Sequence, residues 1–199
     1  MKIIHAVLGK ANPDRMNGVN KVAHQLAKTQ QGMGHEVTVW GIASSLEHAV
    51  STAQVTVPEV WDVRRTIEAR TAALAALSRT DAEAARIVAL AEAMADNFGN
   101  QADMARHDIA FHEAIARASH NALFVQLVSS FGPLMEVAVP TAWSTRTTDA
   151  ERRTIIERHR AVADAILRGD ARAAEAAMDE HFDASVGVLL EGMGSRGMG

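Results

Sequence analysis

The sequence contains no cysteine, and this absence excludes disulfide scaffolds, thiolate zinc sites and cysteine nucleophiles from its 199 residues. It also has no apolar run near the roughly 18–20 residues that a membrane span needs. The first residues, MKIIHAVLGK, turn polar too early for a secretory signal. The net charge of −4 argues against a protein whose main role is to coat nucleic acid. We therefore expect a cytoplasmic protein without a membrane partner.

Lysine is missing from most of the chain. All four lysines lie within the first 28 residues, whereas residues 51–199 carry 15 arginines and no lysine. Residues 1–50 have 5 basic and 3 acidic groups, and residues 51–199 have 15 basic and 21 acidic groups. This break favours two segments of different origin, although chance bias in a short segment is the alternative. We predict a unit over 1–43, a linker over 44–56, a domain over 57–191 and a disordered tail over 192–199.

The first segment has a strand–helix–strand pattern. Apolar residues fill positions 3–8 apart from His5, helical spacing follows from Val19 to Ala27, and a β-rich run occupies 36–40. The loop between the first strand and the helix contains glycine, but it lacks the GxGxxG fingerprint. Residues 1–43 resemble the start of a glycosyltransferase with two facing Rossmann-like domains, through Asn17-Gly18-Val19 and Gly34–Val39. The nucleotide-sugar site of that family lies in its second domain, so this resemblance implies no transferase activity here.

The second segment is helical throughout. Capping boxes, in which a Thr and a Glu three residues later satisfy each other's backbone N–H groups, predict three helix starts at Thr56, Thr80 and Thr148. Gly169 is a natural end for one helix, and Leu77 and Leu123 are expected to face inward. The six predicted helices cover 58–78, 81–97, 101–118, 121–138, 149–168 and 171–191, with Pro140 just past the fourth. The fold class is mainly α: an antiparallel six-helix bundle preceded by a short βαβ segment.

Four chemically suited side chains recur inside these helices. Asp108 and His112 are four residues apart and share one helical face, while His159 and His181 lie in the middle of two other helices. Three nitrogens and one oxygen suit a divalent transition metal with open positions for water or a carboxylate. The alternative is four ordinary hydrogen-bonded side chains. His107 points about 100° away from Asp108, and His120 falls in a turn, so neither is a candidate.

Residues 57–190 resemble the effector-binding and dimerisation (FCD) domain of GntR-type transcription regulators, in the six-helix, VanR-like form of the FadR branch. The matching stretches are Val63–Glu68, Asp108–His112, Ala118–Asn121, His159–Ile166 and Gly169-Asp170 with Ala176 and His181. The resemblance implies that Asp108, His112, His159 and His181 bind Zn, Ni or Mn. It also implies a homodimer that binds a small organic acid effector through the metal, Arg64 and Asn121.

The chain departs from that family before residue 57. The family carries a winged helix-turn-helix there, whereas residues 1–55 show no recognition helix with basic side chains. We therefore do not expect this chain to bind DNA, and we expect a sensor domain without catalytic residues. Three alternatives remain open at this point: a metal-dependent enzyme on a helical bundle, a glycosyltransferase-related fragment, and a structural dimeric bundle without metal.

Overall fold

The computed structural model describes residues 1–7, 18–96 and 99–194. Helices dominate this part of the chain, and the only sheet in it has two strands. The mainly α prediction is therefore confirmed. Of the predicted disordered tail, residues 192–194 belong to the last helix, and residues 195–199 lie outside the described residues.

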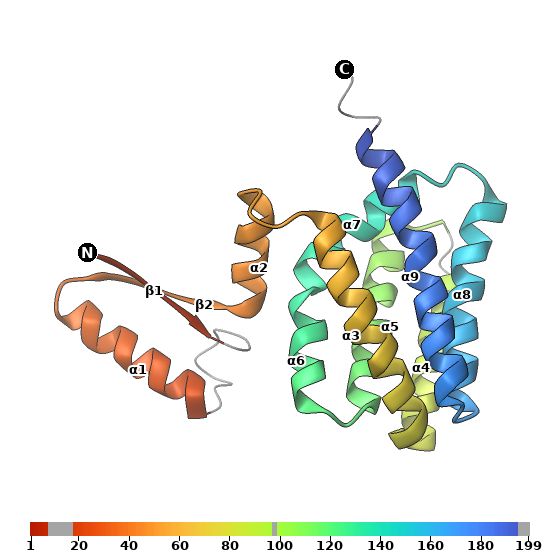
Figure 1. The fold of residues 1–199 in the computed structure, drawn as a ribbon, viewed down its shortest axis with the longest axis horizontal. Helices are drawn as coiled ribbons and strands as arrows, with labels where there is room; N and C mark the ends of the chain where they lie inside the picture. The colour runs from red at the N-terminus through yellow and green to blue at the C-terminus, as the bar shows by residue number, and fades with distance from the viewer. Residues whose placement is uncertain (8–17, 97–98, 195–199) are drawn as a thin grey trace.

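The N-terminal unit is a βαβ arrangement, as predicted. Strand β1 (Lys2–Val7) pairs in parallel with β2 (Glu36–Gly41), from Lys2 opposite Glu36 to Val7 opposite Gly41. Helix α1 (Gly18–Gly32) connects them and packs against both. Gly34 has φ +83°, a left-handed conformation that favours glycine, at the turn into β2. Figure 1 shows this unit beside the bundle rather than within it.

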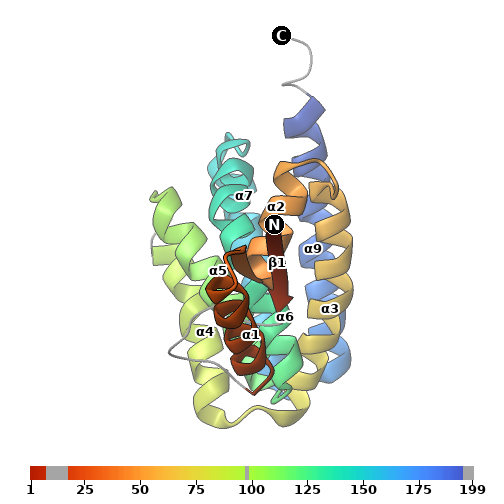
Figure 2. The same ribbon diagram turned by 90° about the vertical axis from the view of Figure 1, so that its left-hand side faces the viewer.

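The range predicted as a linker contains a further helix. Helix α2 (Ile42–Ser51) follows β2 directly and packs against two helices of the bundle, α6 and α7. Only the short stretch from Thr52 to Thr56 then leads into the bundle. The N-terminal unit is thus attached to the bundle through a packed helix, which Figure 1 shows between the two parts. In Figure 2 the same unit lies in front of the bundle.

The bundle contains seven described helices where six were predicted. They are α3 (Val57–Ser78), α4 (Asp81–Asp96), α5 (Gln101–Ala118), α6 (Ala122–Ser130), α7 (Gly132–Ser144), α8 (Asp149–Leu167) and α9 (Ala171–Gly194). Helix α9 packs against α3 and α8, and α5 packs against α3, α4 and α7. The core is a continuous cluster of small and large apolar side chains, with Phe111, Ile115, Ile166 and Phe182 almost inaccessible.

The prediction of one helix over 121–138 was wrong. The chain bends by 52° between α6 and α7, at Phe131 and Gly132. Pro133 lacks an N–H and suits the first turn of a new helix, so it starts α7. Pro140 does not follow the helix but lies inside it, and α7 continues to Ser144, just past the buried Trp143.

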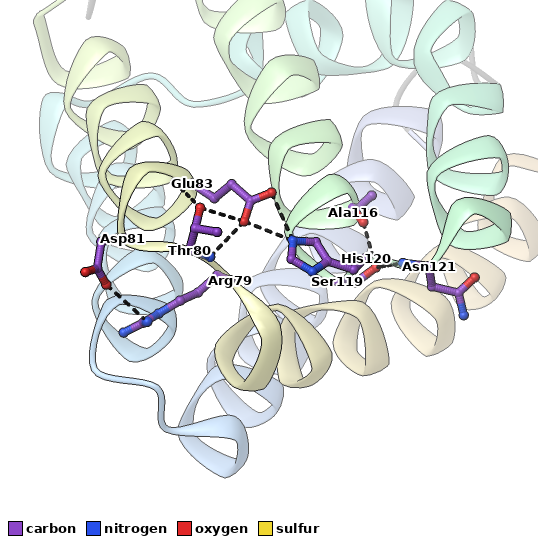
Figure 3. A network of polar contacts seen from close by, with 8 residues as sticks. All are labelled: Arg79, Thr80, Asp81, Glu83, Ala116, Ser119, His120 and Asn121. Carbon is purple, nitrogen blue, oxygen red and sulfur yellow. Dashed lines mark hydrogen bonds and ion pairs between the residues drawn. The ribbon is translucent and has the colours of Figure 1, made fainter.

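Local hydrogen bonds fix the ends of the helices. All three predicted capping boxes form, and Gly169 ends α8 with φ +72°. Figure 3 shows Glu83 at the start of α4 accepting hydrogen bonds from the Thr80 backbone (2.8 Å) and approaching His120 Nε2 (3.0 Å). His120 is exposed, as expected, and has φ +53° in the turn after α5. This contact ties the α3–α4 corner to the α5–α6 corner.

No single helix among the described residues is long and apolar enough to cross a membrane. Helices α6 and α7 reach that length and composition only when taken together across their 52° bend.

Candidate metal and effector site

Three helices bring the four predicted ligands together. Asp108 and His112 come from α5, His159 from α8 and His181 from α9. One donor atom from each side chain lies within 4.8 Å of the others. The three imidazoles are buried and the Asp108 side chain is 13% exposed. Bonds of about 2.0–2.2 Å to a central ion put opposite donors about 4.4 Å apart, so the cluster could hold a metal after shifts of a few tenths of an ångström.

Polar contacts at the back of two imidazoles orient their rings. Nδ1 of His159 lies 2.8 Å from the carbonyl oxygen of Ile155, which only accepts, so Nδ1 carries the proton. Nδ1 of His112 lies against the Glu68 carboxylate as an ion-pair contact, without the geometry of a hydrogen bond. Both side chains therefore direct Nε2 toward Asp108 Oδ1, at 3.1 Å from His159 and 4.0 Å from His112.

This arrangement requires a positive charge at its centre. The lone pair of a neutral Nε2 and a carboxylate oxygen are both acceptors and repel each other at 3.1 Å. Either a second proton on His159 or a metal ion between the two groups removes the repulsion. A histidine held from behind by a carbonyl or carboxylate is the usual arrangement of a metal ligand.

The electrostatics of the other two ligands fit the same chemistry. Burial alone raises the pKa of Asp108, but the close contact with Nε2 of His159 and the nearby His112 and His181 hold that pKa well below its ordinary value. Burial, and then the neighbouring His159 and His112, lower the pKa of His181 well below its ordinary value. At neutral pH the site therefore offers a carboxylate and a neutral imidazole, the forms that bind metals.

Arg64, the predicted anion-binding cation, borders the same cavity but already has a partner. Its Nε lies 2.7 Å from Oε1 of Glu68, one turn further along α3, and both side chains are at most 4% exposed. Its guanidinium packs over Trp61 and Phe182, at 5.0 and 5.2 Å from the ring centres. Glu68 thus links Arg64 to His112 in a buried chain of polar contacts. Sequence reasoning gave Glu68 no role, although an Arg and a Glu four residues apart on one helix are a recognisable pair.

Asn121, the other predicted effector contact, lies elsewhere. It is exposed at the start of α6, where its side chain accepts from the backbone of Leu123 (3.0 Å) and Phe124 (3.4 Å). Figure 3 shows it at the α5–α6 corner, beside His120. Its role here is to cap a helix, and it does not line the cavity beside the metal ligands.

The cavity beside the ligands has a volume of about 50 Å³. One water takes roughly 10–15 Å³ on this measure, so the space admits about four water-sized groups. Its walls include the four candidate ligands and Arg64, together with Trp61, Trp143 and Arg146, which sequence reasoning missed. Arg146 follows α7 and is only 8% exposed. A turn residue shows no helical periodicity, so nothing in the sequence marked it as buried.

Comparisons with known proteins agree with this architecture. Residues 59–184 match the FCD domain family. The chain is 33% identical over 134 residues to the putative L-lactate dehydrogenase operon regulatory protein of Escherichia coli (strain K12), covering 62% of this chain and 48% of that protein. It is 30% identical over 167 residues to the HTH-type transcriptional regulator LutR of Bacillus subtilis (strain 168), covering 79% and 74%.

A third relative is the putative transcriptional regulatory protein NedR of Micromonospora viridifaciens, 31% identical over 105 residues, covering 53% of this chain and 74% of that protein. The chain spans about half the length of the Escherichia coli relative. All three relatives are named as regulators, and the family match covers more than half of this chain. The chain therefore belongs to the FCD domain family, the effector-binding domains of GntR-type transcription regulators, and is not an enzyme.

Proposed function

We propose that this domain senses a small carboxylate in a metal-dependent way. The observation that carries the proposal is the pair of imidazoles whose Nδ1 atoms are held from behind by Ile155 and Glu68, so that both Nε2 atoms converge on Asp108. His181 completes the set from a third helix. Such positioning is costly to build for a site that binds nothing, because it buries polar groups that repel one another.

The metal is Zn, Ni or Mn, all of which accept imidazole and carboxylate ligands. Asp108, His112, His159 and His181 would hold it. When bound, the ion supplies a fixed positive charge and open positions to which a carboxylate can attach. The protein residues orient the ligands, exclude water and limit the size of what enters.

The charges around the cavity support an anionic effector. The carboxylates of Asp108 and Glu68 balance the guanidiniums of Arg64 and Arg146, so the charge of a bound divalent ion is left uncompensated. An organic acid restores neutrality in a site that is largely shielded from water. The 50 Å³ cavity favours a short acid of the size of acetate or lactate. The name of the Escherichia coli relative makes L-lactate the first acid to test.

The output of the domain is also a proposal. We place it in the cytoplasm as a homodimer of the FadR branch, where the effector acts by binding one of two arrangements more tightly than the other. The described part of residues 1–56 forms a βαβ unit and a helix rather than a helix-turn-helix. We therefore expect no sequence-selective DNA binding by this chain, and a gel-shift titration at low salt tests that expectation.

Metal analysis tests the core of the proposal. Protein purified without chelator should contain close to one equivalent of Zn, Ni or Mn, and His159→Ala should contain almost none while its far-UV circular dichroism stays helical. His120→Ala, which changes an exposed histidine that is not a candidate ligand, is the matched control. Wild-type protein that binds none of these metals at micromolar concentration would refute the proposal.

A further inference from the structure

We infer that Arg146, together with the indole N–H of Trp61, holds the carboxylate of the effector, and that Arg64 serves instead as the counter-ion of Glu68. This inference rests on the proposed function and assigns the residues that contact the anion. It changes the predicted role of Arg64 and gives roles to two residues that the sequence did not single out.

Arg64 is poorly placed to attract an anion. Glu68 neutralises its charge at 2.7 Å, and another of its nitrogens, Nη1, contacts the sulfur of Met135. The aromatic rings of Trp61, Phe131 and Phe182 lie within 5.0–5.8 Å of the guanidinium carbon. A carboxylate entering beside Arg64 would meet the field of Glu68 as well, and the two negative charges would repel each other.

Arg146 is the contrasting cation of the same cavity. It is 8% exposed, it lines the cavity with Asp108, and its Nη1 donates to the backbone carbonyl of Ala142. Within the described residues, no carboxylate lies within 4.0 Å of its guanidinium. Burial and the charge of Arg158 lower the pKa of Arg146, and the more distant charges of Glu151 and Asp108 oppose this effect. An arginine remains charged at neutral pH. Its remaining N–H groups can form the two-pronged hydrogen bonds that arginine makes with carboxylates.

Trp61 supplies an independent observation. Its side chain is 5% exposed and borders the cavity, yet its Nε1 has no hydrogen-bond acceptor anywhere in the described part of the chain. A buried donor without a partner is unfavourable, and a ligand that accepts a hydrogen bond from it removes that cost. An oxygen of a metal-bound acid would provide the missing acceptor. Arg146 and Trp61 come from the α7–α8 turn and from α3, so the acid would also bridge two parts of the bundle.

The test separates anion binding from metal binding. Zinc affinity is measured first by competition with a chelator, and L-lactate and acetate are then titrated calorimetrically into the zinc-loaded full-length chain. Arg146→Gln should weaken binding of the acid by at least about tenfold, because a charge-assisted pair is lost. Its zinc affinity should stay within about twofold. Arg146→Lys, which keeps the charge but loses the fork, should recover part of the binding, and Trp61→Phe should weaken it severalfold.

Two controls complete the experiment. Arg117→Gln, which removes an exposed arginine of α5, should bind both ligands normally. Arg64→Lys keeps a counter-ion for Glu68 but loses the two-pronged fork, so it should keep acid binding within about threefold. Normal acid binding by Arg146→Gln, or its loss in Arg64→Lys alone, would overturn the inference. Zinc-loaded wild-type protein that binds neither acid would overturn it together with the effector proposal, whereas failure to bind zinc would overturn the metal proposal itself.

Discussion

Removing the charge of Glu68 should destabilise the bundle more than any exposed substitution. Glu68 is 2% exposed and contacts both Arg64 and His112. Burial by itself raises the pKa of Glu68, but the charges of Arg64 and His112 hold that pKa below its ordinary value, so the group is ionised in the folded state. Glu68→Gln would leave the Arg64 guanidinium buried without a counter-ion.

The size of the effect follows from the geometry. At 2.7 Å and an effective dielectric constant near 20, the attraction between Arg64 and Glu68 is about 6 kcal/mol. Part of this offsets the cost of taking both charges out of water. Breaking one partner of a buried pair therefore costs about 3–5 kcal/mol, which corresponds to a fall in Tm of roughly 6–20 °C for a domain of this size.

A neighbouring arginine on the same helix provides the control. Arg65 pairs with Asp179 at 3.0 Å, but both side chains are about 40% exposed. Arg65→Gln should cost less than about 1 kcal/mol, because water competes with an exposed pair. The assay is urea unfolding of the metal-free protein at pH 7, so that bound metal adds nothing to the measured free energy.

A double-mutant cycle isolates the pair. Arg64→Gln/Glu68→Gln should be less destabilised than the sum of the two single variants, because neither charge is left alone. The reasoning would be refuted if Glu68→Gln lost less than 1 kcal/mol, or no more than Arg65→Gln, or if the two single effects were simply additive.

Three further substitutions test other features. Asn121→Ala should lower the free energy of unfolding by about 1 kcal/mol through loss of a cap and leave L-lactate affinity unchanged; weaker lactate binding would restore its effector role. The hydrogen bond from the Thr80 backbone N–H is the largest cause that lowers the pKa of Glu83, and burial opposes it. The Thr80 hydroxyl and His120 lower the pKa further. The stabilisation by Glu83 is present above the unfolded pKa near 4.3 and is lost as pH falls through the lower folded-state pKa. Wild type and Glu83→Ala should therefore differ in urea midpoint at pH 6 and approach each other as pH falls below that range, and divergence at low pH would contradict this. Pro140→Ala should raise Tm, because it restores an N–H inside α7, and a fall in Tm would show that the proline is accommodated without strain.

The local features of the fold were predictable from sequence because a few neighbouring residues determine them. The capping boxes at Thr56, Thr80 and Thr148 and the glycine end at Gly169 were confirmed. Inward-facing positions were harder, since Leu77 and Leu123 are 68% and 55% exposed. Each lies near a helix end, where no neighbouring helix covers the predicted apolar face. The Gly-Pro pair at 132–133 signalled the missed bend.

The site was only partly predictable for a related reason. Spacing and family resemblance identified the four candidate ligands, which the fold brings together from three helices. Glu68 behind His112 and Arg146 in the cavity wall were not visible, because a buried charged residue looks like a surface charge in a sequence. Only tertiary packing shows that these charges are enclosed and what each of them faces. Asn121 shows the opposite case: the family resemblance implied an effector contact, but in this chain its side chain caps α6.

The 52° bend between α6 and α7 determines whether the cavity beside the candidate ligands is enclosed. The 13 residues of α7 are about 20 Å long at 1.5 Å per residue. If α6 simply continued in a straight line, the far end of α7 would be displaced by about 17 Å. Trp143 and Arg146 would then project away from the bundle, and the candidate ligands on α5, α8 and α9 would be exposed to solvent. The change of direction at Gly132 and Pro133 thus places α7 over the cavity, and the length of α7 sets how much of the cavity it covers.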